Sequence, residues 1–74
     1  MTMLEQEVYE AVARSLREFG YPDATAQMVH DTHTAMVEGK SGAELPHGIV
    51  GRFAESQLKE AAERGLISLD AIGD

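Results

Sequence analysis

Residues 4–23 read LEQEVYEAVARSLREFGYPD, and this stretch decides the fold. Its apolar side chains recur every three or four residues, which is the spacing of one face of an α-helix, at Leu4, Val8, Val12, Leu16 and Phe19. Gly20 favours the left-handed conformation in which helices often end, and Pro22 cannot continue a helix. We therefore predict an amphipathic helix over about residues 2–19, whose apolar face, Phe19 included, points into the interior, followed by a sharp turn.

Two further helices are indicated downstream of this turn. Asp23 directly follows Pro22 and is a good N-cap, so a second helix is predicted over about residues 23–38. Residues 40–48 are rich in glycine, serine and proline, which is typical of a loop. A third helix is predicted from residue 48 or 49 to residue 64.

Glycines mark the ends of these two helices. Gly39 follows the second helix and Gly65 the third, and Leu66 is placed to pack back on the last turn, as in a Schellman motif. Ser68 indicates a cap for one short further turn over residues 69–72. The residues predicted to point inward are Met28, Val29, Thr32, Ala35 and Met36 in the second helix, and Val50, Phe53, Ala54, Gln57, Leu58 and Ala61 in the third. The sequence thus predicts an all-α fold, a small three-helix bundle with a short fourth helical turn at the C-terminus, forming a single helical domain over residues 1–74.

The composition bounds what such a bundle can do. A chain of 74 residues has room for one domain, and the absence of cysteine excludes disulfides and thiolate metal sites. The sequence has no secretory signal and no apolar run near the ~20 residues of a membrane span, so we expect no membrane association. The 13 acidic and 6 basic side chains give a net charge of −7, which makes nucleic-acid binding unlikely without a local basic face.

Reaction chemistry finds little support in the sequence. His30 and His33 lie three residues apart, a spacing that could place two zinc ligands on one face, and His47 lies in the predicted loop. No Cys pattern reinforces the pair, and the neighbouring Asp31 is interpreted as pointing elsewhere. We interpret these histidines as surface or half-buried polar residues. Nucleophile and phosphate-binding motifs are also absent, so we predict no enzyme, with no catalytic, cofactor-binding or metal residues and no cofactor.

A helix-turn-helix-like DNA-binding regulator is the alternative function. It would require the third helix to reach bases with Arg52, Ser56, Gln57 and Lys59. Three glutamates on the same helix, at positions 55, 60 and 63, would repel phosphate. The segment before this helix is also longer than the 3–4-residue turn of that motif.

The segment over residues 44–53 is the most unusual part of the chain. Gly48 and Gly51 weaken the start of a helix but permit close approach of another backbone, from within the protein or from a partner. Two alternatives remain open: this segment packs inside the protein, or it forms a partner-binding or self-association edge. The predicted partner-binding residues are Leu45, His47, Ile49, Arg52 and Phe53.

Three stretches resemble a family of small proteins from bacteriophages of actinobacteria, chiefly mycobacteria: residues 4–9 (LEQEVY), 19–23 (FGYPD) and 45–54 (LPHGIVGRFA). The resemblance covers most of the chain up to about Gln57, and the Leu-Pro-His-Gly block is its most specific part. It carries over no activity and no functional residue. It implies expression inside a bacterial host, where small phage proteins often bind a host protein.

The tripeptide Phe19-Gly20-Tyr21 is also similar to the first inter-helix turn of ubiquitin-associated-type three-helix bundles, a similarity that bears on topology alone. From the residues and the phage resemblance together, we expect a non-enzymatic interaction protein in the host cytoplasm. Its partner would be a host or phage protein, or a second copy of the chain in a homodimer.

Overall fold

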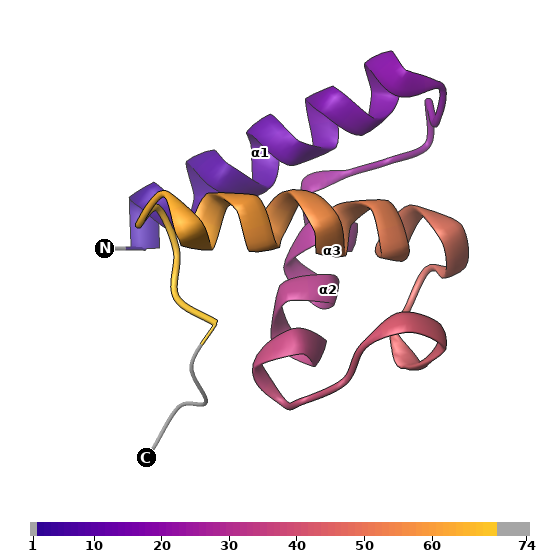
Figure 1. Cartoon of the computed structure of the whole chain (residues 1–74). Coiled ribbons are helices and arrows are strands. Elements are labelled where there is room, and N and C mark those ends of the chain that lie inside the picture. Colours follow the sequence, from indigo (N-terminus) through magenta and orange to yellow (C-terminus); the bar gives the residue numbers. More distant parts are fainter. Residues whose placement is uncertain (1, 70–74) are drawn as a thin grey trace.

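The computed structural model describes residues 2–69, with side chains from residue 5 onward. Three α-helices and one short 3-10 turn follow one another: α1 (Thr2–Phe19), α2 (Ala26–Val37), η1 (Gly42–Glu44) and α3 (Gly48–Glu63). Each α-helix packs against both others, and the described residues form no strand. In Figure 1, α1 and α3 run across the molecule, α2 passes behind α3, and the loop with η1 lies below. The predicted all-α fold of three packed helices is confirmed.

The helices end where the sequence places glycines. After α3, Gly65 adopts a left-handed φ of 79°, its amide bonds to the carbonyl of Ala62, and the amide of Leu66 bonds to the carbonyl of Ala61. These two bonds define a Schellman motif and confirm the predicted stop. The same pair of bonds closes α1 at Gly20 and α2 at Gly39.

The predicted N-cap of the second helix at Asp23 is wrong. The cap is Thr25, whose extended backbone precedes the first turn and whose Oγ1 accepts a hydrogen bond from the amide of Met28 at 3.3 Å. The helix starts later because Ala24 first turns into the core, where the guanidinium of Arg17 donates to its carbonyl oxygen at 2.8 Å. Asp23 therefore lies in the link and stays exposed.

The core forms where the three helices meet. Its buried members come from every α-helix, from the link before α2 and from the segment after α3: Val8, Tyr9, Val12, Ala13, Leu16, Ala24, Val29, Ala54, Leu58, Ala61 and Ile67. Most predicted inward positions are buried or half-buried. The side chain of Leu4 and the predicted fourth turn over residues 69–72 lie outside the described side chains and residues.

Two predicted inward residues are instead exposed. Phe19 is 67% exposed and Phe53 is 36% exposed, although both continue the helical period of their stripes. At this end of the molecule α1 and α3 diverge (Figure 1). The rings of Phe19 and Phe53 lie 5.2 Å from each other and outside the buried core cluster. Tyr9 and Ala13 take up core positions that the sequence did not predict, because α2 packs against that side of α1.

Candidate functional site

Three aromatic side chains gather at the end of the molecule where α1 leads into α2. The ring of Phe53 lies 5.2 Å from that of Phe19 and 5.5 Å from that of Tyr21, and the rings of Phe19 and Tyr21 are 6.0 Å apart. These separations are those of favourable aromatic pairs. Together with Ile49, which is 57% exposed, and Arg52 on the same helix as Phe53, the three rings form what we call the aromatic surface.

An open hollow lies within this surface. It is lined by Ile49, Arg52, Phe53 and Ser56 and has a volume of about 380 Å³. A cavity of roughly 150 Å³ is enough to hold a benzene ring. The hollow therefore has room for an apolar side chain of a partner, and the arginine at its edge can stack on a ring or pair with a carboxylate.

The structure brings four of the five residues predicted to bind a partner close together. Ile49, Arg52 and Phe53 lie together on the aromatic surface. Leu45 is only 6% exposed, but it lines a neighbouring hollow of about 310 Å³ together with Ile49 and Arg52. His47 is the N-cap of α3, with a left-handed φ of 69°, and its side chain turns toward α2.

Phe19 and Tyr21 belong to the aromatic surface, although the sequence prediction did not include them. The signal available in the sequence was an aromatic residue on each side of Gly20, at a turn that exposes what flanks it. Phe19 was assigned to the core because it continues the period of α1.

Asp31 ties the loop before α3 to α2. Its Oδ2 lies 2.9 Å from Nε2 of His47, and its Oδ1 accepts from the side-chain Nε2 of Gln27 at 3.0 Å. Nδ1 of His30 lies 3.7 Å from the same Oδ1. The interpretation that Asp31 points away from the histidines is therefore wrong. The hydrogen bond with His47 is the main reason that the pKa of Asp31 lies below its ordinary value, and the bond with Gln27 adds to it.

His33 is 7% exposed, so its interpretation as a surface or half-buried residue is also wrong. Its Nε2 lies 2.8 Å from the backbone carbonyl of Ser68, which can only accept, so Nε2 carries the proton. In the neutral ring Nδ1 then accepts from the hydroxyl of Tyr9 at 2.7 Å. This chain of bonds joins α1, α2 and the segment after α3. Burial raises the pKa of Tyr9 above its ordinary value, and the charge of Glu5 adds to the effect.

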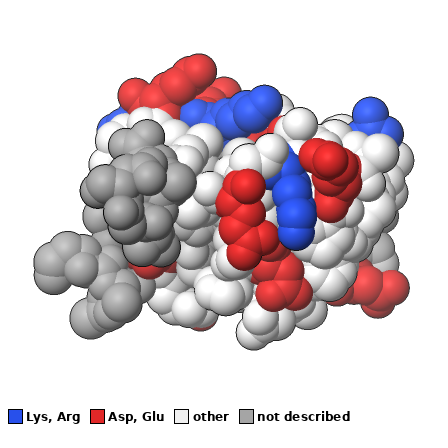
Figure 2. All heavy atoms as spheres, turned by 90° about the horizontal axis from the view of Figure 1, so that it is seen from below, with Lys and Arg blue, Asp and Glu red and all other residues white. Residues whose placement is uncertain are grey.

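Two further kinds of site, for a metal ion and for DNA, were considered from the sequence. Within residues 5–69 no three histidines or acids come together in an arrangement suited to a metal ion. Two of the side chains considered for reading DNA are engaged inside the protein: Gln57 donates to Oγ of Ser15 at 3.0 Å, and Lys59 pairs with Glu55 at 3.5 Å. Figure 2 shows one face of the molecule, on which basic side chains are separated by acidic or uncharged ones.

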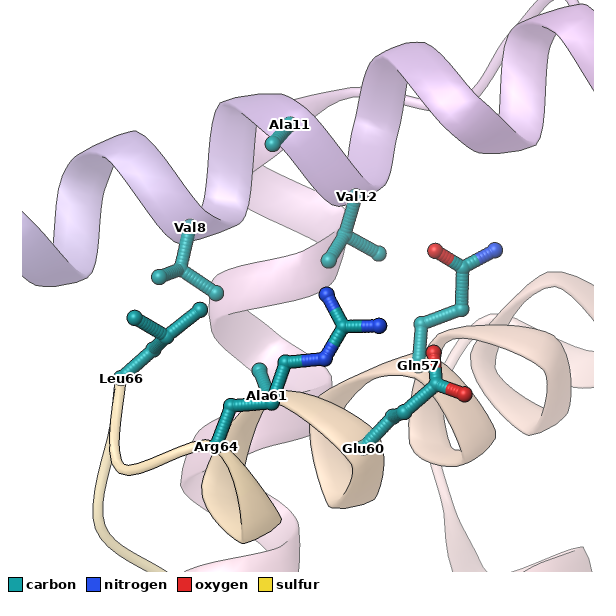
Figure 3. Close-up of a pocket in the computed structure, with 8 residues that line it drawn as sticks. All are labelled: Val8, Ala11, Val12, Gln57, Glu60, Ala61, Arg64 and Leu66. Atoms are coloured by element: carbon teal, nitrogen blue, oxygen red, sulfur yellow. The ribbon is translucent and has the colours of Figure 1, made fainter.

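A further, smaller hollow lies between α1 and α3, away from the aromatic surface (Figure 3). Its volume is about 160 Å³. Val8 and Leu66 point toward each other at one end of it, and the side chain of Arg64 reaches across it toward Val12, with Glu60 beside it. The apolar area is small and carries charges of both signs, so it is a weaker candidate than the aromatic surface.

Among the described residues, no helix combines the length and the apolar character needed to span a bilayer. Comparison of the chain with protein-family models, with curated proteins and with solved structures gave no match.

Proposed function

We propose that this chain is a small, non-enzymatic protein of the actinobacterial phage type that acts in the host cytoplasm by binding another protein. The binding site is the aromatic surface, and the partner is a host or phage protein. The proposal needs no cofactor, metal ion, nucleic acid or membrane.

The exposure of a packed aromatic cluster is the observation that carries this proposal. Aromatic side chains supply the largest apolar areas in protein interiors and interfaces, and contiguous apolar patches on small soluble proteins often mark interaction sites. Here three rings contact one another at an exposed end of the molecule, and Phe19 is two-thirds exposed. A polar residue in place of Phe19 would be equally compatible with the end of α1, so the fold itself does not require an aromatic ring there.

The composition of the surface is that of a binding hot spot. Tyrosine, arginine and other large side chains around a pocket contribute most of the binding energy in protein interfaces. The aromatic surface offers Tyr21 and Arg52, with a hollow beside Phe53 that can receive a side chain.

The engagement of the histidines favours a non-enzymatic role. Both ring nitrogens of His33 are hydrogen-bonded inside the protein, and His47 is bonded to Asp31. These bonds hold helices and loops together, and in His33 they leave no free ring nitrogen with which to exchange a proton with a substrate.

The test starts from capture on the immobilised chain in a lysate of an actinobacterial host, followed by mass spectrometry and purification of each candidate. Binding of the purified partner is then measured by calorimetry for the wild type, Phe19→Ser and Ile49→Asp. Both residues are exposed, so the variants retain the fold, which far-UV circular dichroism checks. We expect each to weaken binding about tenfold or more, equal to about 1.4 kcal/mol.

Leu66→Ser is the matched control, because Leu66 is an exposed apolar residue that lies outside the aromatic surface. It should bind the partner as the wild type does. A purified partner that binds Phe19→Ser and Ile49→Asp with unchanged affinity would show that the aromatic surface is not the site.

A further inference from the structure

Resting on the proposed function, we infer that a second copy of this chain occupies the aromatic surface in the isolated protein. Each copy inserts Phe19 into the hollow of the other, around a two-fold axis. A host or phage protein would compete with this second copy for the same surface.

The surface contains both a protruding ring and a hollow that can receive one. Phe19 ends α1 and is 67% exposed, and its ring lies 5.2 Å from that of Phe53, which lines the hollow. In a two-fold interface every contact occurs twice, so one patch must carry both complementary parts. The volume of about 380 Å³ exceeds the roughly 150 Å³ that a benzene ring needs.

The charges beside these two parts are also complementary. Glu18 precedes the protruding ring in the chain and is exposed, while Arg52 lines the hollow and is exposed. Neither makes an ion pair with another of the side chains at residues 5–69. When Phe19 of one copy enters the hollow of the other, its neighbouring carboxylate approaches the guanidinium there. The two-fold axis repeats this pair of Glu18 with Arg52.

A basic partner would match the net charge of −7 but would meet Arg52 beside the hollow. A second copy brings an acid to that arginine and an aromatic ring to the hollow at the same time. Net repulsion between the copies opposes the pairing, so we expect the dimer to be a reversible one whose population rises with concentration.

A charge exchange tests this geometry. Glu18→Arg places a base near the C-terminal end of α1, and Arg52→Glu places an acid near the N-terminal end of α3, so each change suits its helix dipole and should not disturb folding. In a two-fold dimer of either variant, like charges face each other twice. We expect the dissociation constant measured by sedimentation to rise about tenfold for each variant alone.

Mixing the two variants restores both pairs. The arginine introduced by Glu18→Arg in one copy then faces the acid introduced by Arg52→Glu in the other, and the second pair is the native one. The mixed dimer should therefore regain the affinity of the wild type, and native mass spectrometry of an equal mixture should show the heterodimer well above the twofold excess over each homodimer that random pairing gives. Glu63→Arg is the control, because it makes the same change of charge at an exposed position at the end of α3. It should leave the dissociation constant of the dimer unchanged or lower it.

The inference fails if the wild type stays monomeric at every concentration, or if the two variants dimerise as the wild type does, or if their mixture shows no preference for the heterodimer. A monomeric wild type that still loses its purified partner on Phe19→Ser would overturn this inference and leave the proposed function in place. Conversely, the two charge variants could form the expected heterodimer while the purified partner binds Phe19→Ser as well as the wild type. That result would support this inference and overturn the proposed function.

Discussion

Gly51 is the position where one added methyl group should matter most. It is buried in the first turns of α3, and a Cβ there would lie closer than 3.0 Å to the carbonyl oxygen of Pro46, with Oγ1 of Thr32 at 3.5 Å. The obstructing atom belongs to the backbone and cannot rotate away. Overpacking of this kind costs about 1–3 kcal/mol, and the better helix propensity of alanine returns about 1 kcal/mol. Because the backbone must move, we take the upper end and expect Gly51→Ala to lose about 2 kcal/mol.

That loss is a large share of the stability of the protein, because the free energy of unfolding expected for a chain of 74 residues is about 4–11 kcal/mol. Urea denaturation followed by circular dichroism should show it, at one fixed protein concentration so that self-association contributes equally. Lys59→Ala, on the exposed side of the same helix, should stay within about 0.5 kcal/mol of the wild type. If Gly51→Ala is as stable as the wild type, or more stable, then α3 does not pack against the Pro46 carbonyl in this way.

Three further predictions concern the internal hydrogen bonds. Tyr9→Phe leaves Nδ1 of the buried His33 without its donor and should cost about 1–3 kcal/mol in urea, whereas Tyr21→Phe should be near neutral. Because the pKa of Tyr9 is raised above 10.0 in the folded protein, its contribution is fully present below about pH 10 and is lost as the pH rises through the folded pKa; the alkaline loss of stability should be smaller in Tyr9→Phe. Thr25→Ala should cost about 1 kcal/mol as the loss of an N-cap, and Asp23→Ala much less; the opposite order would restore Asp23 as the cap.

The sequence predicted the helices well because its local signals agree. Glycines at positions 20, 39 and 65 each follow an apolar stripe, and each closes a helix with the same pair of bonds. The N-cap of α2 was misplaced because Asp23 and Thr25 are both good caps, and only the burial of Ala24 decides between them. Local preference could not supply that tertiary fact.

The long-range hydrogen bonds were beyond reach for a related reason. His33 bonds to a residue 24 positions earlier and to a carbonyl 35 positions later, and His47 bonds to Asp31 across the loop. A spacing of three residues between His30 and His33 indicates that the two side chains project from neighbouring positions on one face of the helix. It does not reveal that one enters the core between two other segments while the other remains exposed.

The candidate site follows from the place where helical period and burial disagree. A period of 3.6 residues shows that Phe19 and Phe53 continue apolar stripes, but not how far the neighbouring helix extends to cover them. Since α1 and α3 diverge at this end of the molecule (Figure 1), the fold gains little from aromatic residues there. The rings of Phe19 and Phe53 pack on each other and on Tyr21, and of the three only Tyr21 packs against the buried core. Apolar side chains that the core leaves uncovered are most simply explained by a surface that another protein completes. For this reason we place Phe19 and Phe53, which the sequence wrongly assigned to the interior, in the interface.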